Sequence, residues 1–105
     1  MKLVLHHEAS AELEAAAEWY ERQGPGLGHA LLDDVTMALV AITESPTTWP
    51  RIPRGYASTR RFVLARFPYC VVYVERPGEI LVAAIAHTSR EPDYWRERVP
   101  GRGAK

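Results

Sequence analysis

The sequence has one cysteine, no long hydrophobic run and no net charge. Cys70 stands alone, so an internal disulfide is excluded and a reducing cytoplasm is a fitting environment. No apolar run approaches the roughly 20 residues that a membrane-spanning helix needs. The first residues, MKLVLHHEAS, turn polar too early to form the core of a signal peptide. We therefore expect a soluble protein of the cytoplasm that does not enter a membrane.

Motifs for cofactors and metals are also missing. The glycines of residues 24–28 follow a predicted helix instead of a strand, which indicates a turn and not a phosphate-binding loop. His6, His7 and Glu8 adjoin, but consecutive residues of a predicted strand point to opposite faces. Neither cysteine ligands nor a His-x3-His spacing accompany them. We expect no metal and no cofactor.

The absence of net charge conceals an uneven distribution. Residues 1–50 carry eight acids and two bases, whereas residues 51–105 carry eleven bases and five acids, which gives −6 and +6. Such asymmetry indicates an anionic partner for the C-terminal half. We expect the arginines after residue 53 to form one electropositive edge of a sheet. If the two halves interleave in space, their charges would compensate each other instead.

What is present is the composition of a globular domain, with 47% hydrophobic and 25% charged residues over a single domain, 1–105. Apolar residues recur every three or four positions over residues 9–23 and 27–44, which predicts two amphipathic helices. The turn at residues 24–26 is so short that the helices must pack as an antiparallel hairpin. We read the acids of the first helix, such as Glu14 and Glu18, as a solvated face.

Beyond the proline-rich segment 46–53 the hydrophobic period changes from about 3.6 to two. Short connections between the following strands predict an antiparallel meander of residues 60–67, 69–75 and 80–87. With a first strand at residues 2–6, the order is β-α-α-β-β-β, followed by a short helix at 92–98 and a flexible tail from about residue 99 to 105. The fold class is α+β.

The middle strand of the meander is apolar on both faces. Tyr69, Val71 and Tyr73 alternate with Cys70, Val72 and Val74, so the first set faces one side and the second set the other. We expect the helical hairpin to cover one face and another protein to cover the second. Cys70 lies inside this apolar strand and is more typical of a core residue than of a nucleophile.

Chemically active side chains follow the last predicted strand, in the stretch AIAHTSREPDYWRER (84–98). His87 ends the strand, and Arg90 and Tyr94 are four residues apart, so a helical turn would bring them to one side. With arginines of the strand at 60–67, these groups would suit cleavage of a phosphodiester by its own 2′-hydroxyl, which needs a base, an acid and cations. They would equally suit a docking surface for carboxylates, or a salt-bridged corner without function.

Four segments, in this order, resemble the RelE/ParE superfamily of small bacterial toxins from type II toxin–antitoxin modules, often called plasmid stabilisation proteins. They are AELEAAAEWYERQGPGLG, SPTTWPRIP, RRFVLARFPYCVVYV and AIAHTSREPDYWRER. The resemblance implies a helical hairpin on a mostly antiparallel four-stranded sheet. It also implies a cognate antitoxin whose extended, often acidic C-terminal segment wraps the toxin and silences it.

Activity divides within this superfamily: the RelE-like branch cleaves mRNA on the ribosome, and the ParE-like branch inhibits DNA gyrase. Arg90 and Tyr94 resemble a terminal Arg and Tyr of the RNase branch, and Arg61 stands where that branch has a strand Lys. Val63 and Cys70, however, replace a second Lys and an Arg. Each lost cation should cost about 10²–10³ in rate.

We therefore favour a ParE-like toxin that binds and inhibits DNA gyrase. The first alternative is a ribosome-dependent mRNA endonuclease with His87, Arg90, Tyr94 and Arg61 as catalytic residues, and the second is a non-toxic relative retained for partner binding. The residues predicted to bind the antitoxin or the target are Arg60, Arg61, Arg66, Arg90, Trp95 and Arg96. A homodimer or a toxin–antitoxin hetero-oligomer would be compatible with this interpretation.

Overall fold

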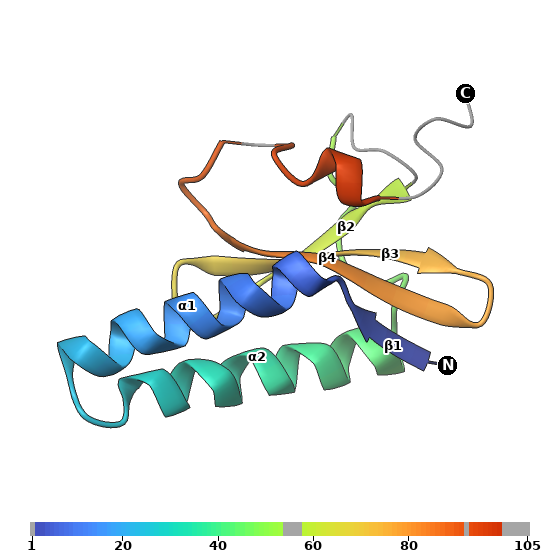
Figure 1. Ribbon diagram of the computed structural model, residues 1–105. Helices are drawn as coiled ribbons and strands as arrows, with labels where there is room; N and C mark the ends of the chain where they lie inside the picture. The colour runs from blue at the N-terminus through green and yellow to red at the C-terminus, as the bar shows by residue number, and fades with distance from the viewer. Residues whose placement is uncertain (1, 54–57, 92, 100–105) are drawn as a thin grey trace.

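A helical hairpin covers one face of a four-stranded sheet, and the C-terminal segment crosses the other face (Figure 1). The computed structural model describes residues 2–53, 58–91 and 93–99. The strand order is β1-β4-β3-β2, and β1 runs parallel to β4 while the other neighbours are antiparallel. The strands are β1 (Lys2–Leu5), β2 (Arg60–Val63), β3 (Tyr69–Arg76) and β4 (Glu79–His87). The predicted meander and the α+β class are confirmed, although β2 ends earlier than predicted.

The two helices are α1 (His7–Gln23) and α2 (Leu27–Glu44). The bounds of α2 are those predicted, whereas α1 begins two residues early because the His6 side chain accepts the N–H of Glu8 and caps the helix. His6 and His7 are therefore not consecutive strand residues, and their rings stack with centroids 4.4 Å apart. The expectation that these two rings face apart was wrong.

The turn of the hairpin is held by a side chain of α1. The Glu21 carboxylate accepts the N–H groups of Gly26 and Gly28, both at 2.9 Å. These groups lie at the N-terminus of α2, where the N-cap residue Gly26 makes no side-chain hydrogen bond. These two bonds lower the pKa of Glu21. At Gly28 the helices approach so closely that a Cβ would lie 2.5 Å from the Ala17 carbonyl oxygen. Glu21 is thus a structural cap and not only a solvated acid.

The alternation predicted for the middle strand is confirmed and produces two hydrophobic cores. Val71 and Tyr73 face the helical hairpin, where they pack with Leu31 and Ile42 of α2. The other face of the sheet presents mostly small and β-branched residues together with one leucine: Cys70, Val72, Val74, Ala83, Ala84, Ala86 and Leu81. Because both faces are apolar, each must be covered.

The C-terminal segment departs most from the prediction. The chain makes a single 3-10 turn, η2 (Arg96–Arg98), and not the helix expected at 92–98, of which Pro92 lies outside the described residues. Trp95 is 4% exposed and Val99 is 2% exposed, because both pack on the second face of the sheet. The protein therefore covers that face itself. Val99 belongs to this core and not to the expected tail, and residues 100–105 lie outside the described part.

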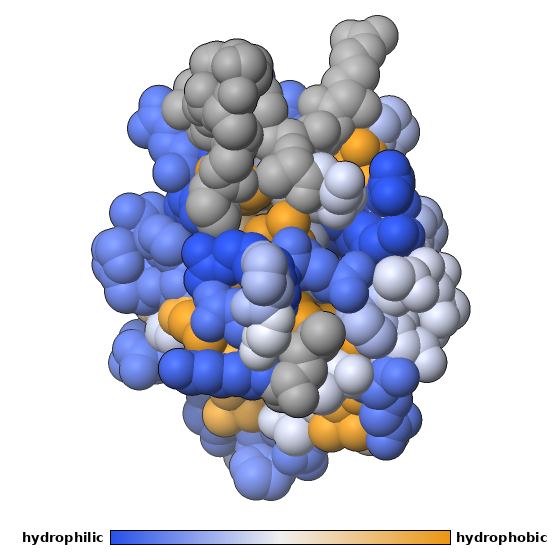
Figure 2. Space-filling view, turned by 90° about the vertical axis from the view of Figure 1, so that its right-hand side faces the viewer, coloured by the Kyte–Doolittle hydropathy of each residue, from blue (hydrophilic) through white to orange (hydrophobic). Residues whose placement is uncertain are grey.

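Among the described residues, the large hydrophobic side chains that are exposed are Trp19, Leu27, Leu32, Met37, Val40 and Val63, four of which lie on α2. Figure 2 views the end of the molecule where β3 turns into β4, and there hydrophobic residues form small patches among hydrophilic ones. No helix in the described ranges is both long enough and apolar enough to cross a bilayer. A cleft lies away from this end, between α1 and the last residues of β4.

Candidate functional site between helix and sheet

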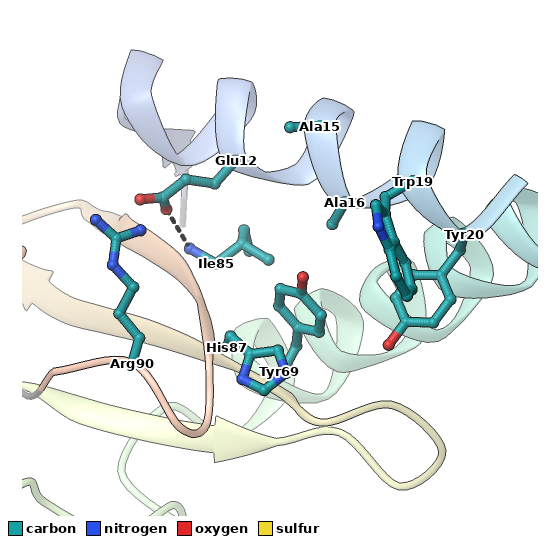
Figure 3. A pocket seen from close by; sticks show the side chains of 9 residues that line it. All are labelled: Glu12, Ala15, Ala16, Trp19, Tyr20, Tyr69, Ile85, His87 and Arg90. Carbon is teal, nitrogen blue, oxygen red and sulfur yellow. Dashed lines mark hydrogen bonds between the residues drawn. The ribbon is translucent and has the colours of Figure 1, made fainter. Parts of the chain in front are cut away.

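A cleft of about 430 Å³ opens between α1 and the ends of β3 and β4 (Figure 3). Glu12 and Arg90 lie at one end of it, Trp19 and Tyr20 lie at the other, and the Tyr69 hydroxyl points into the space between them. Its size falls within the range of ligand pockets, about 300–1,000 Å³. The full lining is Glu12, Ala15, Ala16, Trp19, Tyr20, Tyr69, Ile85, His87 and Arg90.

The Glu12 carboxylate joins three parts of the chain at this cleft. It accepts the N–H of Ile85 at 3.0 Å and the hydroxyl of Tyr94 at 2.9 Å, and it lies 3.0 Å from the Arg98 guanidinium. Burial, and then the bond to Glu12, raises the pKa of the Tyr94 phenol. The sequence analysis placed Glu12 among the surface acids, although its spacing of three residues from Ala9 and four from Ala16 puts it at the border of the buried stripe, unlike Glu14.

His87 is held in one tautomer by the residue two positions on. Its Nδ1 accepts the backbone N–H of Ser89 at 3.1 Å and lies 2.8 Å from the Ser89 hydroxyl. Because a backbone N–H can only donate, Nδ1 carries a lone pair, and a neutral imidazole then carries its proton on Nε2. The nitrogen that faces away from Ser89 is therefore a donor and not a base.

The four residues of the predicted catalytic set do come together, around a second and smaller cavity. Arg61, His87, Arg90 and Tyr94 all line a space of about 90 Å³ beneath the C-terminal turn. The Arg90 guanidinium carbon lies 3.9 Å above the Tyr94 ring, a cation–π contact. Arg90 and Tyr94 therefore lie on the same side of the chain, as predicted, although a turn and not a helix brings them together. The cavity is well below the usual size of a ligand pocket, about 300 Å³ or more.

A profile of the family described as "ParE toxin of type II toxin-antitoxin system, parDE" matches residues 3–92. The chain belongs to the ParE toxin family. A solved structure described as "Chromosomal ParDE TA system from P. aeruginosa" contains a chain of similar fold, with a TM-score of 0.74 over 85% of this chain and 97% of that chain. The two are 20% identical, so this likeness concerns the fold alone. A comparison with curated proteins found no match.

Membership in the ParE family confirms the resemblance seen in the sequence, but the predicted binding residues do not form one surface. Arg66 contacts Asp34 and the Ala30 carbonyl of α2, on the hairpin face of the sheet. Arg96 lies in the turn that crosses the opposite face and pairs with Asp93. Trp95, also in the predicted set, is buried. The expectation of one electropositive edge was wrong.

The arginines do not form one positive surface because acidic side chains of the helices, strands and loops form ion pairs with many of them. Arg98 lies 2.9 Å from Glu8 as well as close to Glu12, and Arg76 pairs with Glu79. Arg60 donates to the carbonyl oxygen of Trp49 at 2.6 Å. Arg61 and Arg90 remain exposed. The positive half of the sequence is therefore interleaved with negative groups in this ParE protein.

The two positions at which the RNase branch has cations are uncharged here and differ in exposure. Val63 on the edge strand β2 is 55% exposed, whereas Cys70 is 5% exposed and faces the second core. Burial raises the pKa of the Cys70 thiol. Within the described ranges, no three His, Cys, Asp or Glu side chains are placed to hold a metal ion.

Proposed function

We propose that this ParE family member arrests growth by binding DNA gyrase in the cytoplasm, and that a cognate antitoxin silences it by binding to the toxin. The observation that carries the proposal is the state of the groups that RNA cleavage would use. His87 and Tyr94 are both engaged in hydrogen bonds within the chain.

Cleavage by a 2′-hydroxyl needs a base for its proton, an acid for the leaving oxygen and cations near the phosphate. The Nδ1 of His87 already accepts the Ser89 N–H, and the Tyr94 hydroxyl donates to Glu12 with a raised pKa. Neither group is available as a base without breaking an internal bond. The absence of charge at Val63 and Cys70 removes two cations, at about 10²–10³ in rate for each. A binding toxin requires none of these groups.

One observation favours the mRNA endonuclease as a second candidate. Arg61, His87, Arg90 and Tyr94 line the same small cavity, so a movement of the C-terminal turn would widen one site that contains all four. A non-toxic relative retained for partner binding remains the third interpretation. The three differ in what expression of the protein does to a cell.

The test is tightly controlled expression of the wild type and of the variants His87→Ala and Tyr94→Phe. We expect growth arrest with all three, a DNA-damage response, intact mRNA, and recovery when the antitoxin is co-expressed. Purified protein should also inhibit supercoiling by gyrase. Loss of arrest in folded variants, with rapid mRNA loss in the wild type, would establish the nuclease instead. Normal growth with every protein would leave only the non-toxic relative.

A further inference from the structure

The outward side of α2 is apolar, although it is exposed. α2 lies at the outside of the molecule, beside α1 and β1 (Figure 1). Leu32, Met37 and Val40 are exposed on this helix, and it carries no charged side chain from residue 35 to residue 43. Contiguous exposed apolar surface of this kind marks an interaction site.

Five residues that recur every three or four positions form one side of this helix, which we call the α2 strip: Leu32, Thr36, Leu39, Val40 and Thr43. Its two threonines add methyl groups and not open polar groups. The Thr36 hydroxyl donates to the Leu32 carbonyl at 2.9 Å, and the Thr43 hydroxyl donates to the Leu39 carbonyl at 2.8 Å. Because both hydroxyls are satisfied inside the helix, the strip can be covered by another apolar surface without losing a hydrogen bond.

A hollow of about 440 Å³ lies along the C-terminal half of the α2 strip. Its lining is Leu3, Thr36, Leu39, Val40, Thr43 and Glu44. The four strip residues among them stand at positions i, i+3, i+4 and i+7 of the helix. Four residues with this spacing form the hole that receives one side chain of a facing helix in knobs-into-holes packing. The hollow therefore suits a second helix laid along α2.

The two ends of α2 indicate which helix fits. Glu44 ends the helix, at the negative pole of its dipole, and no basic residue lies in that last turn. The Glu44 carboxylate makes no hydrogen bond or ion pair within the described part of the chain. His29 lies in the first turn, at the positive pole, where no acid is present. A second α2 laid antiparallel would bring each Glu44 to the His29 of the other copy, and each negative helix end to a positive one.

The chain also supplies the side chain that fills the hollow. Leu32 is 39% exposed on the strip, one turn before Thr36. If Leu32 of one copy enters the hole of the other, it lies opposite Leu39 and Val40. This alignment places the two-fold axis close to Thr36 and sets His29 beside Glu44, as the charges of the helix ends require. A two-fold contact of this kind uses the same patch on both copies.

We propose that two copies of the chain form a dimer through antiparallel α2 helices, with Leu32 of each copy in the hollow of the other. The knob, the hole and the complementary helix ends all belong to one helix, which is why the occupant is a second copy of this chain. No residue of α2 lines the cleft between α1 and the sheet, so the dimer uses a different surface from that cleft. The inference does not depend on the target of the toxin.

Sedimentation velocity of the purified full-length chain tests the pairing. We expect a dimer whose dissociation constant rises about tenfold or more in Leu32→Glu, because a carboxylate would then enter each apolar hollow. Leu27→Glu is the matched control, since Leu27 is 38% exposed on the same helix but lines neither hollow beside α2. Its dissociation constant should stay within about twofold. A wild type that stays monomeric at every concentration, or equal effects of the two changes, would overturn the proposal.

Single cysteines test the direction and the register of the two helices. Thr36 lies near the two-fold axis, so Thr36→Cys should form a disulfide between copies under mild oxidation. Val40 belongs to the same strip, but antiparallel pairing separates its two copies by about 12 Å along the helix, so Val40→Cys should not link. The wild type, whose Cys70 is buried, is the blank. Equal linking of both variants would indicate a parallel pair or random collision and would overturn the proposal.

The antitoxin is the other protein that could cover the α2 strip, and the same two variants exclude or establish it. Its affinity is measured at toxin concentrations below the dissociation constant of the dimer, where the toxin is monomeric. We expect Leu32→Glu and Leu27→Glu to bind the antitoxin equally, within about twofold. If Leu32→Glu alone weakens antitoxin binding, the strip belongs to the antitoxin and the proposed dimer is overturned.

Discussion

The Tyr94 hydroxyl donates a 2.9 Å hydrogen bond to the Glu12 carboxylate, although the two residues are 82 positions apart. The same carboxylate accepts the Ile85 N–H and pairs with Arg98, whose guanidinium also donates to the Ala83 carbonyl. One side chain of α1 therefore ties the edge of β4 and the C-terminal segment together. The second core depends on this polar network as well as on apolar contact.

Replacing Glu12 should weaken the whole fold. In Glu12→Gln the side-chain volume is kept, but the partly buried Arg98 loses one of its two carboxylate partners. We expect the free energy of unfolding to fall by about 1–3 kcal/mol. Urea denaturation followed by tryptophan fluorescence measures the change. Glu14→Gln, on the exposed side of the same helix, should stay within about 0.5 kcal/mol. Equal stability of the two variants would contradict the role of Glu12.

The two tryptophans Trp95 and Trp19 should respond differently to the same substitution. Trp95 is 4% exposed and packs on the second face of the sheet, whereas Trp19 is 50% exposed at the cleft. Trp95→Phe should cost about 1–3 kcal/mol of unfolding free energy, and Trp19→Phe about 0.5 kcal/mol or less. Thermal unfolding by circular dichroism gives both values. If the Trp95→Phe protein had the same unfolding temperature as the wild type, the C-terminal segment would add no stability.

The cap formed by Glu21 should make stability depend on pH. Its pKa is lowered in the folded chain by the bonds from Gly26 and Gly28, so folding favours the ionised carboxylate. Its contribution is complete above the pKa of the unfolded chain and is lost as pH falls through the lower pKa of the folded chain. Wild type should therefore have a higher Tm than Glu21→Gln at pH 7, and the gap should close toward pH 3. Glu18→Gln is the control, and a gap that does not change with pH would refute the cap.

The close approach of the two helices should not tolerate a methyl group. In Gly28→Ala the new Cβ would lie 2.5 Å from a backbone oxygen of Ala17, so the helices must separate. We expect a net loss of about 1–3 kcal/mol in unfolding free energy, even though alanine favours a helix by about 1 kcal/mol over glycine. Chemical denaturation measures it, with His29→Ala as the neighbouring control. A gain in stability would mean that the helices are not in contact there.

Local patterns predicted the elements whose residues interact mainly with their own neighbours in the chain. The bounds of α2 followed from apolar residues that recur every three or four positions between Gly26 and Ser45, and the two faces of β3 followed from simple alternation. The four candidate catalytic residues line one cavity, and their role stays a prediction. The sequence did not predict the hydrogen bonds of His87 and Tyr94, because these bonds depend on where their partners Ser89 and Glu12 lie in the folded chain.

The sequence by itself determined the order of helices and strands and, through its motifs, the resemblance to the RelE/ParE superfamily, within which the family comparison then placed the chain among ParE toxins. Periodicity and turn residues act over a few positions, and a single chain displays them directly. Only the tertiary structure decided that Trp95 covers the second face of the sheet and that the arginines are dispersed. It also decided that Glu12 bonds to Ile85, Tyr94 and Arg98 and is not a solvated surface acid. Each of these facts depends on contacts between residues far apart in the chain, and such contacts leave no local pattern.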